Sequence, residues 1–229
     1  MCTLLFRYLP GDEYPLALLA NRDETYDRPY SGWGWRGVDR EFFAPLDQKA
    51  GGSWIGLGGS GLVVALTNIL PAARGGKFRS RGSLVTDMLG FNAAAKAAAA
   101  AEREVTNARY GQFNLLVADR ETAWMLVWHR DRLKRYAIEP GTYEVRNRPF
   151  AAKTSKSHVE GENALWLEQM APRLQRHPQV CKHGPGYGTR CSHKLLLSRA
   201  GTGQSRIWHL DGHPCSGKFR LVLPEGNEA

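Results

Sequence analysis

The order of strand-like and helix-like segments limits the fold of this 229-residue chain more than any other feature. Two apolar runs, Cys2–Leu9 and Pro15–Asn21, flank a Pro-Gly-Asp-Glu turn and predict an N-terminal β-hairpin. Residues 51–56 and 61–67 predict a second hairpin. Between the hairpins, residues 25–48 lack periodicity and predict a long ordered loop. The first third of the chain therefore favours antiparallel sheets.

Two adjacent helices are predicted next, one opening with Ser80 and one rich in alanine. The predicted elements from this point are helices at residues 80–89 and 92–105, strands at 113–118, 122–129 and 132–138, a helix at 162–174, and strands at 189–198, 205–210 and 218–223. Strands and helices do not alternate as in a doubly wound fold, so the order indicates stacked sheets with helices outside. We predict one domain over residues 1–229.

Composition and charge narrow the possible partners. Lys and Arg number 31 against 22 Asp and Glu, and the formal charge of +9 favours anionic partners. The densest basic stretch, residues 74–81, is short and interrupted by glycine, so we expect a solvated loop and no nucleic-acid partner. No apolar run approaches the roughly 18 to 20 residues that span a bilayer, and no leader pattern opens the chain, so we expect a cytoplasmic protein. The four cysteines are too scattered for a disulfide framework, and we expect reduced thiols.

Cys2 is the first candidate for chemistry. Methionine aminopeptidase removes Met1 when the next side chain is small, which would leave a cysteine at the start of the mature chain. A thiol and an α-amine, with ordinary pKa values of about 8.5 and about 7.7 to 8.0, would then lie on one residue, so that the amine can deprotonate the thiol. On its own, a cysteine at this position is more often a small buried hydrophobic residue.

Four polar residues, Asn21-Arg22-Asp23-Glu24, follow the second apolar run. If the two strands of the hairpin pair, these residues lie close to Cys2. An arginine there lowers the pKa of a thiol, and an aspartate holds an ammonium or guanidinium group in place, which is the arrangement of a preformed thiolate site. The alternative is a surface turn with a local salt bridge.

Several short motifs together resemble the NRDE family over nearly the whole chain. They are Met1-Cys2-Thr3, Ala20-Asn21-Arg22-Asp23-Glu24, Arg28-Pro29, Ala50-Gly51-Gly52-Ser53-Trp54-Ile55-Gly56, Leu66-Thr67-Asn68, Arg79-Ser80-Arg81-Gly82 and Tyr187-Gly188-Thr189-Arg190. That family is similar to the bile-salt and penicillin amidases of the N-terminal-nucleophile (Ntn) hydrolases. The resemblance implies an α+β fold, a four-layer αββα sandwich, with Cys2 as the nucleophile and Arg22 and Asp23 as its partners.

The same resemblance implies roles for further residues. In the amidases, an asparagine before a proline-containing turn helps to form the oxyanion hole, and Asn147 matches it. Asn68 is a candidate second donor, and Arg190 matches a late arginine that lines the amidase site. Trp33 and Trp35 follow the Arg-Asp motif, and we expect them to form one wall of an apolar acyl pocket.

The chain departs from the family pattern in three places. Val145-Arg146-Asn147 stands where the family has Leu-Ser-Asn, Thr154-Ser155-Lys156 replaces a Trp-Pro-Lys element, and Ile69 replaces an aromatic residue or arginine. These changes predict a different loop on the substrate side. The reaction expected is hydrolysis of an amide-type C–N bond in a small acyl substrate through a thioester, without a cofactor.

Two other readings stay open. Cys181-Lys182-His183 and Cys191-Ser192-His193 present soft ligands at a spacing that places them on one side of a strand, so both pairs could converge on zinc. That spacing is unusual for structural zinc, and we expect no metal ion. Alternatively, the family's link to transport and Golgi organisation suggests a non-catalytic haem or lipid carrier. The chain has no Cys-Pro dipeptide, but iron ligands are available in His129, His177, His183, His209 and His213.

Overall fold

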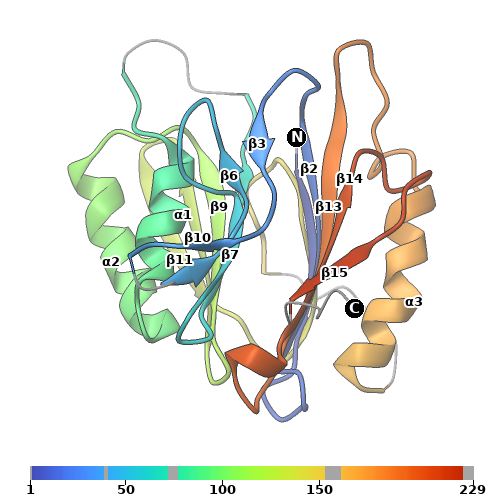
Figure 1. The fold of residues 1–229 in the computed structure, drawn as a ribbon. Helices are drawn as coiled ribbons and strands as arrows, with labels where there is room; N and C mark the ends of the chain where they lie inside the picture. Colours follow the sequence, from blue (N-terminus) through green and yellow to red (C-terminus); the bar gives the residue numbers. More distant parts are fainter. Residues whose placement is uncertain (1, 39–40, 72–76, 153–160, 224–229) are drawn as a thin grey trace. The chain divides into compact units, whose positions relative to one another are not determined.

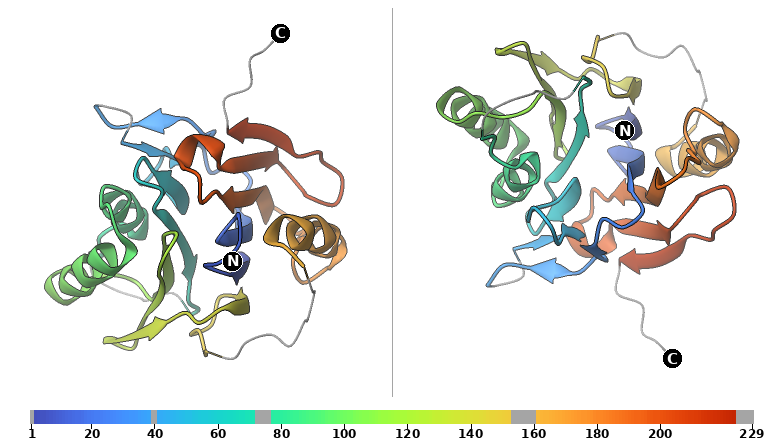
Figure 2. Two further views of the ribbon diagram at one scale, coloured as in Figure 1. Left: turned by 90° about the horizontal axis from the view of Figure 1, so that it is seen from below. Right: turned by 90° about the horizontal axis from the view of Figure 1, so that it is seen from above.

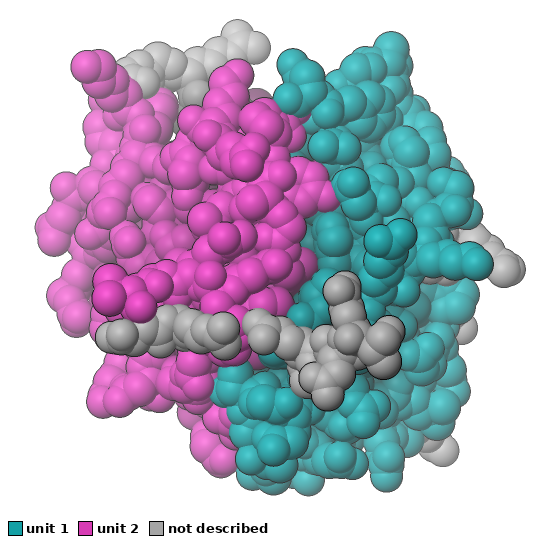
Figure 3. Space-filling model, viewed as in Figure 1, with its two compact units in different colours: residues 1–27, 140–144, 153–229 teal, residues 28–139, 145–152 magenta. Residues whose placement is uncertain are grey.

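A computed structural model describes residues 2–38, 41–71, 77–152 and 161–223, and contacts divide the chain into two compact units (Figure 3). Unit 1 comprises residues 1–27, 140–144 and 153–229, and unit 2 comprises residues 28–139 and 145–152. Each unit is built on an antiparallel sheet with helices on one face (Figures 1 and 2). In the described part of the chain, no helix is both long enough and apolar enough to cross a membrane. The single domain stays a prediction.

Unit 1 contains a six-stranded sheet in the order β12-β1-β2-β13-β14-β15, with α3 beside it. The bounds are β1 Thr3–Tyr8, β2 Leu16–Thr25, β12 Gly141–Val145, α3 Asn163–Arg176, β13 Tyr187–Leu197, a 3₁₀ turn Thr202–Gln204, β14 Arg206–Asp211 and β15 Arg220–Leu223. The strands and the helix predicted for this part of the chain are confirmed within a few residues. β12 was not predicted, because its short sequence Gly-Thr-Tyr-Glu-Val has a weak apolar pattern beside Pro140.

The predicted N-terminal hairpin is confirmed, with pairs running from Thr3 opposite Asn21 to Tyr8 opposite Leu16. Both strands are buried on both faces, which explains their continuous apolar runs. The prediction was wrong about where the second strand ends. β2 continues through the polar motif to Thr25, because β13 pairs with it as far as Tyr187 opposite Thr25. The Asn-Arg-Asp-Glu motif is therefore strand and not turn.

Helix α3 covers one face of this sheet (Figure 2). Its side chains Trp166, Leu167 and Met170 form a buried cluster with Leu5 of β1 and Leu19 of β2. Residues of β2 with odd numbers therefore point toward α3, and residues with even numbers point to the other face. This alternation decides where the site residues project.

Unit 2 contains a seven-stranded sheet in the order β11-β10-β9-β8-β7-β5-β4 and a two-stranded sheet β3-β6. The bounds are β3 Tyr30–Ser31, β4 Trp35–Arg36, β5 Phe42–Phe43, β6 Leu46–Asp47, β7 Ile55–Gly58, β8 Val63–Asn68, α1 Arg81–Leu89, α2 Ala94–Asn107, β9 Phe113–Ala118, β10 Ala123–His129 and β11 Arg132–Ala137. The second hairpin, both helices and the strand meander are confirmed. The predicted long loop contains four two-residue strands, which are too short to produce a periodic pattern.

Helices α1 and α2 pack side by side on this sheet (Figure 1). The Ser80 side chain caps α1 by accepting a hydrogen bond from the Gly82 N–H. The alanines of α2 that face the sheet are fully buried at helical spacing, which allows close packing; they are Ala94, Ala97, Ala98 and Ala101. Arg79 bridges the helices through Asp87 and Glu104. Arg79, which belongs to the basic stretch at residues 74–81, thus has a structural role. Residues 74–76 of that stretch lie outside the described part.

Two of the family motifs meet where the second hairpin touches the start of α1. Gly52 has a φ of +76°, and a Cβ on it would overlap the backbone carbonyl carbon of Gly82. The Ser53 N–H donates to the Gly82 carbonyl at 3.0 Å. Glycine is therefore required at position 52 by close approach of two backbones, and these motifs are explained by packing.

Candidate active site

Cys2 directly precedes β1 and lies beside the polar motif of β2. Thr3 pairs with Asn21, so continuing the antiparallel register by one residue places Cys2 opposite Arg22. The backbone N–H of Asp23 donates a hydrogen bond to the Cys2 sulfur, and both Arg22 and Asp23 act electrostatically on the thiol. The hairpin thus brings the predicted nucleophile and its two predicted partners together.

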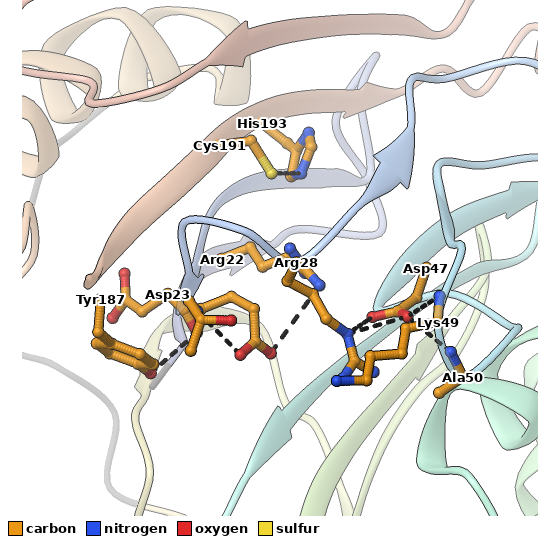
Figure 4. Close-up of polar contacts among 11 residues, drawn as sticks. Arg22, Asp23, Arg28, Asp47, Lys49, Ala50, Tyr187, Cys191 and His193 are labelled. Atoms are coloured by element: carbon orange, nitrogen blue, oxygen red, sulfur yellow. Dashed lines mark hydrogen bonds and ion pairs between the residues drawn. The ribbon is translucent and has the colours of Figure 1, made fainter.

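Arg22 and Asp23 nevertheless project to opposite faces of the sheet. Arg22 lies on the same face as Cys2, and its guanidinium is 3.9 Å from the carboxylate of Glu24. The Asp23 carboxylate points away from the Arg22 side chain (Figure 4) and is fully buried. The alternation along β2 places it on the α3 face. It accepts a hydrogen bond from Thr189 Oγ1 at 2.7 Å and pairs with Lys182 Nζ at 2.9 Å. Asp23 therefore contacts Cys2 through its backbone, and its side chain anchors the end of β2.

The Cys2 thiol is not preformed as a thiolate with Met1 in place. Burial raises the pKa of Cys2, and the nearby Asp23 carboxylate adds to this, while the Asp23 N–H and the Arg22 guanidinium lower it. The net shift is upward. Desolvation of the charged form outweighs the guanidinium here. The arrangement expected for a preformed thiolate site stays a prediction. A base is needed to remove the proton.

Arg190 lies at the same end of the sheet. It is the extra residue of a β-bulge in β13, between Thr189, which pairs with Asp23, and Cys191, which pairs with Arg22. Its carbonyl accepts a hydrogen bond from the Gly212 N–H at 2.8 Å. Bulges redirect a side chain relative to the regular pleat, which makes this position suitable for aiming an arginine.

The two predicted oxyanion donors meet each other in unit 2. The side-chain amide of Asn147 donates to the backbone carbonyl of Asn68 at 2.7 Å. The side-chain amide of buried Asn114 donates to the backbone carbonyls of Arg146 at 3.2 Å and Arg148 at 2.9 Å. Asn114 was not among the residues predicted from the sequence. The asparagine element is thus held on both sides. Its role as an oxyanion donor stays a prediction, and the neighbouring departure at residues 154–156 lies outside the described part of the chain.

Trp33 and Trp35 pack on one shared aromatic residue. Each ring centroid is 5.4 Å from that of Phe43, and both tryptophans keep part of their surface exposed. Such an aromatic cluster supplies apolar surface with a fixed orientation. The acyl-pocket role remains a prediction.

A cysteine and two histidines that the resemblance did not include lie near Arg22. Cys191 Sγ is 3.5 Å from His193 Nε2, and His193 Nδ1 is 3.3 Å from His209 Nδ1. Burial lowers the pKa of His193 far below its ordinary value, and the charges of His209 and Arg22 lower it further. His193 is therefore a neutral imidazole at physiological pH. The regular spacing of Cys191 and His193 on β13 was the only signal in the sequence.

The two Cys-x-His pairs do not converge on one metal ion, as the zinc alternative required. Cys181 and His183 form a cluster with His213, whereas Cys191 and His193 contact His209. The pairs are separate because β13 begins at Tyr187, so Cys181 and His183 lie in the preceding turn. The alternative in which both pairs share one zinc ion therefore does not hold.

Comparison with known proteins identifies the family. The family model for Transport and Golgi organisation 2 matches residues 1–171. The chain belongs to this family. It is 32% identical over 250 residues to the mouse (Mus musculus) Transport and Golgi organization 2 homolog, and 29% identical over 248 residues to the Transport and Golgi organization protein 2 homolog of Bos taurus. Each alignment covers 88% of this chain and 90% of the relative.

Solved structures show that this family member shares the Ntn hydrolase fold. A Caenorhabditis elegans N-acylethanolamine-hydrolyzing acid amidase ortholog is similar with a TM-score of 0.56 and 13% identity, covering 91% of this chain and 99% of the other. Penicillin V acylase from Agrobacterium tumefaciens is similar with a TM-score of 0.56 and 8% identity, covering 98% and 86%. A mutant conjugated bile acid hydrolase from Clostridium perfringens has a TM-score of 0.53 and 9% identity, covering 96% of each chain. The predicted α+β sandwich class is confirmed.

Proposed function

We propose that this family member is an N-terminal cysteine hydrolase that cleaves an amide-type C–N bond in a small acyl substrate. The observation that carries the proposal is the position of Cys2 opposite buried Arg22, with the Asp23 N–H on its sulfur. The fold shared with an amidase, an acylase and a bile acid hydrolase supports the same reaction class.

The raised pKa of Cys2 explains why a terminal cysteine is needed. A protonated thiol is a weak nucleophile, and removal of Met1 would place an α-amine on the same residue to accept its proton. The thiolate then attacks the carbonyl carbon, and the C–N bond breaks as the amine leaves with the transferred proton. Water attacks the thioester, which releases the acid and restores the thiol.

The remaining residues have distinct proposed roles. Arg22 stabilises negative charge on the face that carries Cys2. Asp23 is a positioning residue, because its buried side chain holds β2 while its N–H contacts the sulfur. Asn147, Asn68 and Arg190 remain candidates for stabilising the oxyanion, and the loss of one such donor typically costs about 3 to 4 kcal/mol of barrier.

The substrate class follows from chemistry common to the neighbours' names. The names of two neighbours give an N-acylethanolamine and a conjugated bile acid as the compounds that those proteins hydrolyse. The formal charge of +9 favours an acyl substrate with an anionic group through long-range attraction. Trp33 and Trp35 are the candidate apolar contacts for its acyl chain.

Intact-mass spectrometry tests the proposal directly. The purified protein should lack Met1, and a sub-stoichiometric acyl electrophile should add one acyl group to Cys2 that disappears over time as water hydrolyses the thioester. The experiment should use a Cys215→Ala background, because Cys215 is an exposed competing thiol. Cys2→Ser should slow acylation, and Cys2→Ala should abolish it.

Two outcomes would contradict the hydrolase. They are retention of Met1 on the purified chain, and a label that spreads evenly over Cys2, Cys181 and Cys191. The non-catalytic alternative, a haem or lipid carrier, instead predicts that Cys2→Ala leaves ligand binding unchanged while acylation is absent in the parent protein.

A further inference from the structure

Four metal-ligating side chains gather in unit 1 from two turns that are distant in the sequence. Cys181 and His183 lie in the turn before β13, and His213 and Cys215 lie in the turn between β14 and β15. The two segments have mirrored patterns, Cys-Lys-His and His-Pro-Cys. From this cluster we infer that the chain binds one Zn²⁺ ion through Cys181, His183, His213 and Cys215.

The distances match those of a tetrahedral zinc site. Cys181 Sγ is 3.4 Å from His183 Nε2, and His183 Nε2 is 3.2 Å from Cys215 Sγ. Zinc bonds of about 2.3 Å to sulfur and about 2.0 to 2.1 Å to nitrogen place neighbouring ligands about 3.6 Å apart in a tetrahedron. The ligand atoms of Cys181, His183 and His213 all lie within 4.8 Å of one another. Cys215 joins this group through its contact with His183 Nε2.

The contacts within the cluster keep the ligands available. The Nδ1 atom of His213 is buried and has no hydrogen-bond partner among the described residues. A buried nitrogen of this kind needs a partner, and a metal ion is one. The His183 and His213 rings stack with centroids 4.0 Å apart, so the two imidazoles lie side by side within the cluster.

The backbone already joins the two turns around the site. The backbone N–H of Cys215 donates a hydrogen bond to the Cys181 sulfur, so the segments approach each other without the ion. His213 is held from the side by the edge of Tyr26, with ring centroids 5.7 Å apart. Two sulfur and two nitrogen ligands fill a tetrahedron, so the site is structural, with no position left for substrate. The metal would fix the turn that carries Lys182, which pairs with Asp23.

Zinc alone is the probe for this site. The full-length protein, stripped of metal and kept reduced, should bind one Zn²⁺ per chain in competition with a chromophoric chelator. Co²⁺ should give the intense visible bands of a tetrahedral site and a thiolate-to-cobalt charge-transfer band. Cys215 and His213 both have solvent exposure, so either can be replaced by alanine. Loss of an outer-shell contact typically weakens metal binding by about 10- to 100-fold. Cys215→Ala and His213→Ala should each weaken zinc binding by more than that.

Matched controls separate this site from its neighbours. Cys191→Ala removes the other Cys-x-His cysteine, and His177→Ala removes an exposed histidine just before the turn; neither should change zinc affinity. Cys2→Ala should also bind zinc normally, so failure of the hydrolase leaves this test intact. Zinc should raise the melting temperature of the parent but not that of His213→Ala.

Three results would overturn the inference. They are the absence of stoichiometric Zn²⁺ binding by the reduced parent, affinity unchanged in both Cys215→Ala and His213→Ala, and affinity lost in Cys2→Ala but kept in His213→Ala. A reduced parent that loses two hydrogens on mild oxidation but never binds zinc would instead indicate a Cys181–Cys215 disulfide pair.

Discussion

Replacing Lys182 by methionine tests whether a buried ion pair anchors the end of β2. Lys182 Nζ lies 2.9 Å from the Asp23 carboxylate, whose side chain is 0% exposed against 23% for the lysine. Removing one partner of a fully buried pair typically costs about 3 to 5 kcal/mol. Thr189 Oγ1 still donates to Asp23 at 2.7 Å, and water can reach the position of Nζ. We therefore expect a loss of about 1 to 3 kcal/mol in the free energy of unfolding.

Urea unfolding monitored by circular dichroism measures this loss, with chelator and reductant present so that metal binding does not contribute. The control is Glu102→Gln, which disrupts an exposed pair with Arg135 at 2.8 Å. Exposed pairs contribute little, so the control should change the free energy of unfolding by less than about 0.5 kcal/mol. In a double-mutant cycle, Asp23→Asn should recover part of the Lys182→Met loss, because the uncompensated charge is gone.

The ion pair does not anchor β2 if Lys182→Met costs no more than Glu102→Gln, or if the losses from Asp23→Asn and Lys182→Met simply add. Either result would mean that the carboxylate is solvated despite its buried position. The rate of Cys2 acylation in Lys182→Met supplies a second readout. It should fall, because the Asp23 N–H that contacts the sulfur is no longer held.

Three further predictions concern other parts of the chain. Gly52→Ala should cost more than about 2 kcal/mol in urea unfolding, whereas Gly11→Ala, with open space around it, should be nearly neutral. Burial raises the pKa of Asp47, but hydrogen bonds from Arg28 and two backbone N–H groups lower it overall. The stabilisation from Asp47 is therefore present above pH ~4 and is lost as the pH falls through the lower pKa of the folded state. Asp47→Asn should remove that acid-dependent loss of stability in melting curves. Asn114→Ala should cost about 1 to 3 kcal/mol, because the carbonyls it holds lose their donors; equal stability would contradict this.

Local patterns were sufficient for most of the elements. The Leu-rich runs around Pro10-Gly11-Asp12-Glu13 predicted β1 and β2, and alanine at helical spacing predicted α2. Each of these signals lies within one element, where backbone geometry sets the period. The two-residue strands β3 to β6 escaped prediction because they are too short to show a period, and the short β12 escaped it because it is a strand through pairing with distant β1.

The sequence by itself determined that Cys2 lies beside Arg22 and Asp23, because a hairpin brings its two strand ends together whatever the rest of the chain does. Only the tertiary structure decided that β13 extends β2 through the motif, so that Asp23 faces α3 while Arg22 faces the side of Cys2. It also decided that His213 and Cys215, rather than Cys191 and His193, lie beside Cys181 and His183. The physical reason is that side-chain direction depends on strand pairing, and pairing between distant segments leaves no local pattern.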